Sequence, residues 1–554
     1  MFAKKVPVNN MNFKVNESEK KLRGSYYTPE WIANFVARWI SNYNVKTILE
    51  PSCGDGVFFD EAIRELPSDQ LSLIGFDTDS AALELCRKRP ATLSVDIALH
   101  DQDFLAWAID NIQSNCPQKF DAVVGNPPFV RYQYLEKEQQ ANAQKIFDLL
   151  GMKFTKHTNL WIPFVVSSIE FLIPGGVIGM VIPSEILHVL YAQGLREYLL
   201  SSCSKMLLID PEDLWFDDTL QGAMLLMAQK KTTSREQSSA AIIRTKGKEF
   251  ANGNPYELFN TADYIPGEVL TKKWTYALLS KEELAAYKRV RSSKIFTTFD
   301  NLAAVDVGIV TGANKFFLVP DIVVQEYALE VKAHPMFGRS EHCPGVIYDQ
   351  NQHDQNREHG YPTNFLYFDS ENDGDVYAEY LAVGAKQDIP SRYKCRIRQP
   401  WYKVPSVFST PVNMLKRSNG MPRLILNRLN AYTTDTAYRI TPNAGIDAET
   451  LVACFLNSVT ALSAELEGRF YGGGVLELVP SEIERLVVPY VEGFGTTVDA
   501  LNINVRQLDG KKLLELQDKA LFSGVTDIDY SDIVILQKAL ARLQLRRQRI
   551  ASDD

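Results

Sequence analysis

Four consecutive residues, Asn126-Pro127-Pro128-Phe129, combine groups that can hold a planar amine. They follow the apolar run 120–125, which predicts a buried strand that ends in a rigid loop. Two prolines in a row delete two backbone donors, so the carbonyls of Asn126 and Pro127 have no local N–H to turn toward. These carbonyls and the Asn126 side-chain oxygen can accept hydrogen bonds from an exocyclic amine, and its ring can stack on Phe129. Taken alone, the tetrapeptide is also compatible with an ordinary turn.

Three acidic residues upstream, Glu50, Asp77 and Asp103, each follow an apolar run. Together with Asn126 they are spaced by roughly 25 residues, the length of one strand–helix unit, and the carboxyl ends of parallel strands meet at one edge of a sheet. We therefore expect all four to line that edge. An acid at the tip of the second strand typically accepts hydrogen bonds from ribose hydroxyls. A single strand-end acid can instead cap a helix, and Asp79 is the candidate cap for the helix after the second strand.

The loop after the first strand, Glu50-Pro51-Ser52-Cys53-Gly54-Asp55-Gly56, contains two glycines that allow a ligand to approach the backbone closely. It lacks both the G-x-G-x-x-G pattern and a following Lys-Ser/Thr pair. A P-loop is therefore excluded, and a pyrophosphate site is disfavoured.

The elements that must position these groups follow from their apolar spacing. Thr28 is placed as the N-cap of a helix with Pro29 at its first position, and the apolar residues from Ile32 to Trp39 share one helical face. The runs 175–184, 207–210 and 222–228 predict further strands of the same sheet. Phe216 lies in the loop before the last of them, where core packing is the default role of an aromatic ring.

Composition sets the broad class. The chain has 554 residues, a net charge of −9 and seven scattered cysteines without a CxxC spacing, so it indicates neither a disulfide framework nor a zinc site. No apolar run reaches the roughly 18 residues that a membrane span requires. We expect a cytoplasmic protein of two to four domains that does not enter a membrane.

The polar stretch 230–239 predicts a domain boundary. We expect a polar arm over 1–22, an α/β catalytic domain over 23–232, a mixed α/β domain over 240–495 and a helical segment over 496–554. An amphipathic helix over 532–549 is expected to pack on its own chain.

The stretch 391–428 carries nine basic residues and no acid, with aromatic residues interleaved. In an acidic protein, this pattern favours contact with a polyanion backbone, although a solvated basic face is the plain alternative. The candidates for contact with such a backbone are Arg392, Lys394, Arg396, Arg398 and Lys403. Further along, Gly472-Gly473-Gly474 allows close approach of the backbone to a ligand or to another strand.

In this order, Thr28-Pro29, the loop 50–56, Asp77, Asp103-Phe104 and Asn126-Pro127-Pro128-Phe129 resemble the motif series of the TaqI-like, Eco57I-related DNA adenine-N6 methyltransferases of restriction-modification systems. Residues 23–229 resemble the catalytic half throughout. The segments 310–314, 398–401 and 471–476 resemble the target-recognition half more loosely. The resemblance implies an α/β S-adenosylmethionine-dependent methyltransferase fold, with a Rossmann-like and mostly parallel sheet, followed by a mixed α/β target-recognition domain and a helical tail.

The resemblance also implies roles for individual residues. Asn126 and Pro127 would grip the target amine, and Phe129 and Phe216 would contact the flipped target base. The residues implied to bind S-adenosylmethionine are Thr28, Glu50, Pro51, Cys53, Gly54, Asp77, Asp103, Phe104 and Pro128. No metal is expected, because the sulfonium methyl is already activated. Double-stranded DNA is the expected partner, the chain is expected to act as a monomer, and any cognate endonuclease would be a separate protein.

Three other readings remain open at this stage. The same catalytic motif serves enzymes that methylate glutamine side chains of proteins or guanine amines of RNA. A DNA-binding subunit with an inactive cofactor fold is disfavoured, because every cofactor position holds a plausible residue. A fused nuclease is suggested by Asp321 followed by Glu330-Val331-Lys332, but the residues between them look helical.

Overall fold

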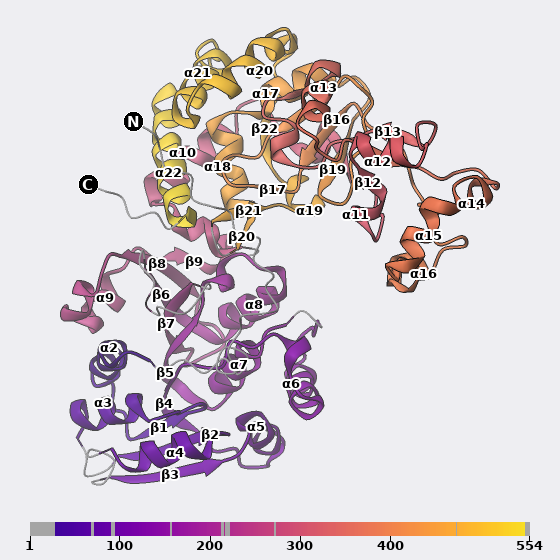
Figure 1. The fold of residues 1–554 in the computed structure, drawn as a ribbon. Helices are drawn as coiled ribbons and strands as arrows, with labels where there is room; N and C mark the ends of the chain where they lie inside the picture. The colour runs from indigo at the N-terminus through magenta and orange to yellow at the C-terminus, as the bar shows by residue number, and fades with distance from the viewer. Residues whose placement is uncertain are drawn as a thin grey trace, which may run out of the picture. The chain divides into compact units, whose positions relative to one another are not determined.

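The computed structural model describes residues 28–67, 71–89, 95–155, 158–211, 215, 222–270, 273–471 and 474–548. The chain forms two compact units, one that ends at Leu278 and one that begins at Leu279 (Figure 1). Each unit has its own sheet system and its own core, and each is described separately below.

The first unit is built on a nine-stranded sheet with the order β3-β2-β1-β4-β5-β7-β6-β8-β9. Its strands are β1 (Thr47–Glu50), β2 (Ser72–Asp77), β3 (Asp96–Asp101), β4 (Phe120–Gly125), β5 (Leu172–Pro183), β6 (Cys203–Pro211), β7 (Ala223–Lys230), β8 (Ser239–Thr245) and β9 (Ile265–Pro266). Strands β1 to β5 run parallel, and β7 inserts antiparallel between β5 and β6. The expected Rossmann-like, mostly parallel sheet is confirmed.

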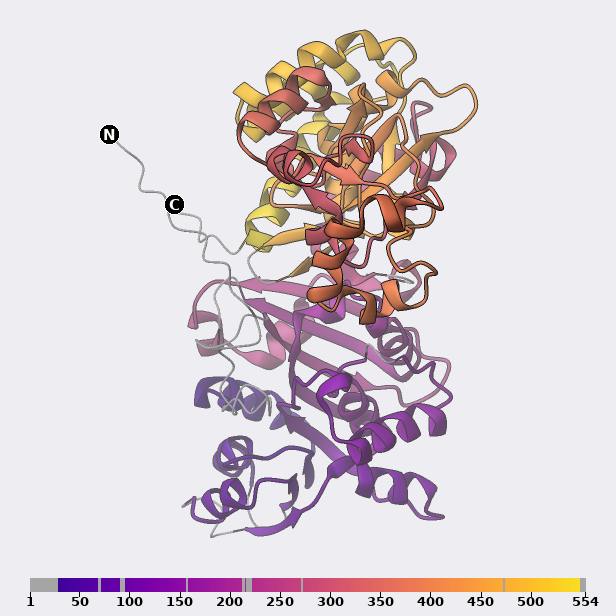
Figure 2. The same ribbon diagram turned by 45° about the vertical axis from the view of Figure 1, so that its right-hand side comes forward.

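Helices cover both faces of this sheet (Figures 1 and 2). They are α2 (Glu30–Ile40), α3 (Val57–Glu65), α4 (Ser80–Arg87), α5 (Phe104–Gln113), α6 (Lys137–Leu149), α7 (Trp161–Glu170), α8 (Gln193–Ser202) and α9 (Pro255–Thr261). Helices α2, α3 and α9 lie together on one face, whereas α5, α7 and α8 lie on the other. The long central strand β5 is buried along almost its whole length, as expected for a parallel strand covered on both sides.

Helix α2 shows how the sequence pattern sets the packing. The predicted apolar face is buried from Ile32 through Trp39. The start of the helix differs from the expectation, because its first residue is Glu30 and the N-cap is Pro29, without a side-chain cap bond. Thr28 therefore lies before the cap, and its hydroxyl has a different partner, described below. The predicted cap Asp79 is confirmed, since its carboxylate accepts from two amides at the start of α4.

The second unit has a mixed sheet with the order β11-β19-β16-β18-β14 and three smaller sheets, β12-β15-β13, β17-β21-β20 and β10-β22. The strands are β10 (Phe296–Thr298), β11 (Ala303–Val307), β12 (Leu318–Val319), β13 (Ala333–Pro335), β14 (Ile347–Tyr348), β15 (Asn364–Leu366), β16 (Val412–Leu415), β17 (Arg417–Ser418), β18 (Leu424–Asn427), β19 (Ala437–Pro442), β20 (Arg469–Tyr471), β21 (Val475–Glu477) and β22 (Val487–Pro489). This is the mixed α/β architecture that we expected for this half.

The helices of this unit form two groups. Helices α14 (Asp373–Val376), α15 (Ala378–Lys386) and α16 (Tyr393–Arg396) form a lobe that projects from the body of the unit (Figure 1). The others are α10 (Lys281–Arg291), α11 (Asn314–Phe317), α12 (Asp321–Glu326), α13 (Gln350–Glu358), α17 (Ala448–Phe455), α18 (Ser458–Glu467), α19 (Pro480–Ile483), α20 (Val498–Gln507), α21 (Gly510–Phe522) and α22 (Tyr530–Gln548).

Two of the expected boundaries need correction. The boundary expected between 232 and 240 lies inside the first unit, because β8 pairs along its whole length with β6 and extends the large sheet. The helical segment expected over 496–554 is not separate from the second unit, since α22 packs against α10 and α18. Its predicted apolar side, including Ile533, Leu536 and Leu540, is buried there.

Candidate active site

The predicted site residues gather where the strand order reverses. Glu50 is the last residue of β1, and Asn126 directly follows β4, the strand beside it. A Cβ built on Gly125 would lie 3.5 Å from Pro51 Cδ and 3.7 Å from Glu50 Cγ, so the two strand ends are in contact. Asp77 ends the neighbouring strand β2. Crevices at such a reversal are where open α/β sheets bind their ligands.

Asn126 is bonded on both its side chain and its backbone. Its Nδ2 donates a 3.2 Å hydrogen bond to Thr28 Oγ1, so the threonine hydroxyl orients the amide. Its backbone carbonyl accepts a 3.1 Å hydrogen bond from the Ser52 hydroxyl. The sequence predicted that this carbonyl could accept a hydrogen bond from an amine ligand, but it accepts from Ser52 and so joins the β4 loop to the β1 loop. The connection between Thr28 and the proline motif could not be inferred from residues that lie so far apart in the sequence.

The Pro127 carbonyl matches the expectation better. Among the described residues, no donor hydrogen-bonds to it, and the two prolines supply none locally. Phe129 is half-buried and packs against the core cluster of the first unit, which holds its ring in a defined place. The motif therefore places an amide, a carbonyl without a protein donor and an aromatic ring within four residues.

Glu50 is the most unusual charged group of the site. The residue is 1% exposed, and its Oε2 atom has no hydrogen-bond partner within the described part of the chain. Burial raises the pKa of Glu50 well above its ordinary value, and the nearby acids Asp55 and Asp77 act in the same direction. A buried carboxylate without a protein partner is costly, so it indicates a cationic or hydrogen-bonding ligand.

Asp77 organises the glycine loop. Its Oδ2 accepts a 2.7 Å hydrogen bond from the Gly54 amide, and its Oδ1 accepts from the Asp79 amide at 2.9 Å. Burial raises the pKa of Asp77. Both carboxylate oxygens retain lone pairs for a further donor, such as a ribose hydroxyl.

Cys53 lies in the same loop and is buried. Its pKa is raised, first by a hydrogen bond to the Cys86 side chain and then by burial. The Cys53 thiol is therefore neutral, and a neutral thiol is a poor nucleophile.

Asp103 and Phe104 are placed differently from the expectation. Asp103 lies two residues beyond the end of β3 and caps α5, accepting from the Leu105 amide at 3.0 Å and from Asn142 Nδ2 at 2.9 Å. Phe104 is 1% exposed, and its ring packs against Phe76 and other core aromatics. The Phe104 ring therefore belongs to the core of the first unit and does not face a ligand site.

Two residues at this edge were not predicted. Glu185 follows the end of β5, beside β4, and accepts a short hydrogen bond from the Tyr191 hydroxyl. Burial raises the pKa of Glu185. It is another strand-end acid, so the rule that found Glu50 and Asp77 would have found it too.

Asn159 is 2% exposed, and its Oδ1 atom has no hydrogen-bond partner in the described chain. It forms an isolated β-bridge with Arg131, just after the Asn126–Phe129 motif. In the sequence it is indistinguishable from a residue before an ordinary helix.

The basic residues of the stretch 391–428 fall into two groups: those whose side chains bind other parts of the second unit, and those whose side chains form no ion pair with a described residue. The structural ones are held by carbonyls or carboxylates of the second unit: Arg398, Lys416, Arg417, Arg423 and Arg428. Four remain exposed with no ion pair to any described residue: Arg392, Lys394, Arg396 and Lys403. Arg398 is thus a correction to the expected DNA contacts, because its guanidinium donates to the Val310 and Thr311 carbonyls at 2.6 and 2.8 Å.

The remaining sequence-based predictions have three outcomes. Phe216, Gly472 and Gly473 lie outside the described residues. Gly474 makes the close approach expected of the glycine run, but to its own chain, since a Cβ there would lie 2.8 Å from the Cα of Gln548 in α22. The fused-nuclease pattern is not assembled, because Lys332 is paired with Asp369 and Asp373 while Asp321 binds Arg357.

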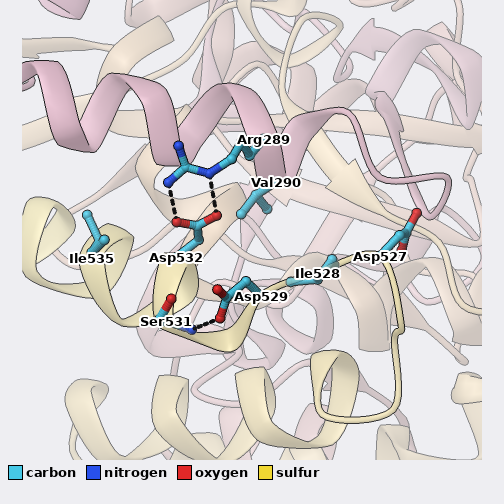
Figure 3. A pocket seen from close by; sticks show the side chains of 8 residues that line it. All are labelled: Arg289, Val290, Asp527, Ile528, Asp529, Ser531, Asp532 and Ile535. Atoms are coloured by element: carbon cyan, nitrogen blue, oxygen red, sulfur yellow. Dashed lines mark hydrogen bonds and ion pairs between the residues drawn. The ribbon is translucent and has the colours of Figure 1, made fainter.

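Three further observations concern the whole described chain. A surface pocket of about 460 Å³ lies between α10 and the start of α22, where Arg289 grips Asp532 at 2.9 and 2.6 Å (Figure 3). The pocket contains none of the predicted site residues.

Within the ranges that the structure describes, no group of three or more His, Cys, Asp or Glu side chains could hold a metal ion. In the same ranges, no helix is both long and apolar enough to cross a membrane.

Known proteins resemble the chain in both halves. Residues 12–256 match the family model of N-6 DNA methylases, and residues 271–522 match that of the C-terminal domain of the type II methyltransferase M.Eco57I. The chain is 24% identical over 490 residues to the type II methyltransferase M.AccI of Acinetobacter calcoaceticus, covering 85% of this chain and 86% of that protein. It is also 24% identical to M.XamI of Xanthomonas campestris pv. amaranthicola, covering 85% of each.

A solved structure supports the fold. The type IIL restriction-modification enzyme MmeI, solved in complex with DNA, superposes with a TM-score of 0.52 at 11% identity and covers 96% of this chain and 80% of its own. The two family models together account for both units, and the named relatives extend over most of the chain. The chain therefore belongs to the Eco57I-related N6-adenine DNA methyltransferases of restriction-modification systems.

Proposed function

We propose that the enzyme transfers a methyl group from S-adenosylmethionine to N6 of an adenine that is flipped out of double-stranded DNA. The observation that carries the proposal is the Asn126 amide, oriented by Thr28 and followed by a Pro127 carbonyl that no described residue engages. These two groups supply two hydrogen-bond acceptors one residue apart, which suits an amine with two N–H bonds.

The proposed use of S-adenosylmethionine rests on the residues at the ends of β1 and β2. The unpartnered Oε2 of buried Glu50 fits a cationic group, and the lone pairs of Asp77 fit hydroxyls. Thr28, Pro51, Cys53, Gly54 and Pro128 belong to the loops around them. The cofactor supplies a methyl group on a sulfonium when it is bound.

The protein's own part in the reaction is to orient the nucleophile. The N6 lone pair of adenine is delocalised into its ring, so it is a poor nucleophile. Accepting its two N–H bonds at Asn126 and at the Pro127 carbonyl favours a pyramidal nitrogen whose lone pair faces the methyl group. Stacking on Phe129 offsets the few kcal/mol that base flipping costs. Phe216 is proposed as a second contact to the base.

DNA would be held by the second unit. Arg392, Lys394, Arg396 and Lys403 are the proposed phosphate contacts, because they are exposed and engaged by no described acid. We further propose that the enzyme acts as a monomer and that a cognate endonuclease, where one exists, is a separate protein.

The test is to express the protein in a bacterial host that lacks DNA methylation and to map modified bases by single-molecule sequencing. N6-methyladenine at one recurring sequence is the expected result. Asn126→Ala should leave the DNA unmodified while the purified variant still binds S-adenosylmethionine in a calorimeter. Normal methylation by Asn126→Ala would refute the assigned role. Unmodified DNA from a wild-type enzyme that binds the cofactor would point instead to a protein glutamine or an RNA guanine as substrate.

A further inference from the structure

Helix α16 and the residue directly after it place two large apolar side chains on the surface of the second unit. Tyr393 is 64% exposed and Ile397, directly after the helix, is 62% exposed. Residues four apart across a helical turn lie on the same side, so the two form one apolar pair. Two exposed apolar side chains on one side of a helical turn form a small contiguous patch, and contiguous apolar patches mark candidate binding surfaces.

This apolar pair stands on a rigid support. The Arg398 guanidinium ties the end of the α16 segment to the carbonyls of Val310 and Thr311. At Gly312, where φ is +79°, a Cβ would lie only 2.7 Å from the Cβ of Lys394, so the loop packs closely against the helix. A surface that is already ordered loses little conformational entropy on binding.

The core of the lobe fixes α16 further. Phe316 stacks on Tyr380 with ring centroids 4.7 Å apart and lies 5.3 Å from Trp401. Cys395, inside α16, is buried and faces the Thr311 carbonyl with its sulfur at 3.8 Å. The exposed pair is therefore the outer side of a helix whose inner side is packed.

Positive charge surrounds the pair. Arg392, Lys394 and Arg396 alternate with it along the chain, and none has an acidic partner among the described residues. The Lys394 ammonium lies 5.6 Å from the centre of the Tyr393 ring. Cations beside a stacking ring fit a ligand with a negatively charged backbone and flat apolar faces, which is the chemistry of nucleic acid.

We propose that Tyr393 and Ile397 enter a groove of the DNA and contact the bases, while the neighbouring cations hold the phosphates on either side. This inference rests on the proposed action on double-stranded DNA and names the element that distinguishes one sequence from another. The cations provide affinity for any duplex, whereas the apolar pair contributes to the difference between the target sequence and other sequences.

The experiment compares three variants with the wild-type enzyme, after the methylation map has identified the target sequence. They are Tyr393→Ala/Ile397→Ala, Arg392→Gln/Lys394→Gln/Arg396→Gln and, as the matched control, Ile322→Ala/Val331→Ala. Ile322 and Val331 are 70% and 79% exposed in the same unit but lie outside the basic stretch. Fluorescence anisotropy measures binding to a duplex with the target and to one without it, at several salt concentrations, and thermal melting checks folding.

The two substituted groups should give different signatures. Tyr393→Ala/Ile397→Ala should lose about 10-fold or more in affinity for the target duplex, with little loss on the other duplex and an unchanged salt slope, since stacking on one base has an energy of about 1–3 kcal/mol. The triple variant should lose affinity for both duplexes and lower the salt slope by about 0.9 for each phosphate contact removed. Tyr393→Phe should keep the selectivity.

Two results would overturn the inference. One is a Tyr393→Ala/Ile397→Ala variant that binds the target as tightly as the Ile322→Ala/Val331→Ala control. The other is an equal loss of affinity for both duplexes, which would show that the pair contributes to DNA binding that does not depend on sequence. Either result leaves the methylation map of the wild-type enzyme intact. A wild-type enzyme that methylates no DNA would instead refute the proposed function from which this inference starts.

Discussion

At the scale of single residues, the proposed catalytic motif depends on a partner that precedes it by almost a hundred positions. Thr28 accepts the Nδ2–H of Asn126 and so determines which side of the amide faces away from it. Without this hydrogen bond, the Asn126 amide could rotate by 180° about its last side-chain bond and exchange the positions of its oxygen and nitrogen. Thr28 and Asn126 therefore orient the amide oxygen together.

Thr28→Val should slow methyl transfer by about tenfold, because a net hydrogen bond is worth about 1–1.5 kcal/mol and the substituted side chain has no acceptor. Binding of S-adenosylmethionine should change less than the rate. Single-turnover kinetics and calorimetry measure the two quantities. Thr28→Ser keeps the hydroxyl and should retain most of the rate. If Thr28→Ser lost the rate while Thr28→Val kept it, the threonine methyl group and not its hydroxyl would be the group that matters.

Glu50 should make cofactor binding depend on pH. Its pKa is raised by burial, so without a ligand the folded protein holds a proton that an unfolded chain would release. The stabilisation from this proton is therefore present below the ordinary glutamate pKa and is lost as the pH rises through the raised value. A cationic cofactor group would bind the ionised carboxylate, so binding should release a proton and tighten with rising pH over the same range.

Calorimetry in two buffers of different ionisation enthalpy measures this proton release. Glu50→Gln should weaken binding by about 10- to 100-fold, since hydrogen bonds to a charged group are worth about 1.5–3 kcal/mol. It should also abolish the proton release. Binding by the wild-type enzyme that is independent of pH would show that Glu50 is not the group that meets the cationic part of the cofactor.

At the scale of elements, the same residue type has two roles within one short segment. Arg392 and Arg398 flank α16, but only Arg398 is used by the fold, where burial lowers its pKa and two backbone carbonyls accept from it. The segment therefore combines a structural clamp with a charged outer surface.

Arg398→Ala should lower the free energy of unfolding by about 2–3 kcal/mol, because it leaves two carbonyls without their donor. Arg398→Lys should recover little, since an ammonium does not have the fork of the guanidinium. Arg392→Ala should change stability by less than about 0.5 kcal/mol but lower the salt slope of DNA binding by about 0.9. Urea unfolding measures the stability and fluorescence anisotropy measures the salt slope. If Arg392→Ala destabilised the protein more than Arg398→Ala does, the proposed division into a structural Arg398 and a DNA-contacting Arg392 would be wrong.

At the scale of the second unit, the helix α22 joins the C-terminal part of the unit to its first helix, α10. Helix α22 packs against α10, the first helix of this unit, and the ion pairs Arg289–Asp532 and Arg542–Glu283 join them. Near its end, Arg547 is 3% exposed and binds Glu465 of α18. It also donates to backbone carbonyls of other loops, including Asn419 and Gly420.

Arg547→Ala should therefore destabilise the second unit by about 3–5 kcal/mol, because it leaves the buried Glu465 carboxylate without its charge partner. The double variant Arg547→Met/Glu465→Gln should recover a large part of this loss, since it removes both charges. Urea unfolding of the full chain, followed by fluorescence, measures the difference. If Arg547→Ala lowered the free energy of unfolding no more than Arg547→Met/Glu465→Gln does, the Arg547–Glu465 ion pair would not be what stabilises the end of α22.

The sequence by itself determined the family, the parallel sheet and the sheet edge at which the predicted site residues gather. Apolar runs that end in Glu50, Asp77 and Asn126 are local signals, and parallel strands bring their ends together whatever the rest of the chain does. The same local logic found the buried face of α2 and the cap at Asp79.

Only the tertiary structure decided which of these groups remain available to a ligand. Hydrogen bonds between distant residues assign the Asn126 carbonyl to Ser52, the Asp103 carboxylate to α5 and α6, and Arg398 to a neighbouring loop. It also decided the domain boundary, because β8 joins the sheet through pairing with β6. The physical reason is that partner choice depends on which surfaces meet in space, and the spacing of residue types along a chain does not encode that.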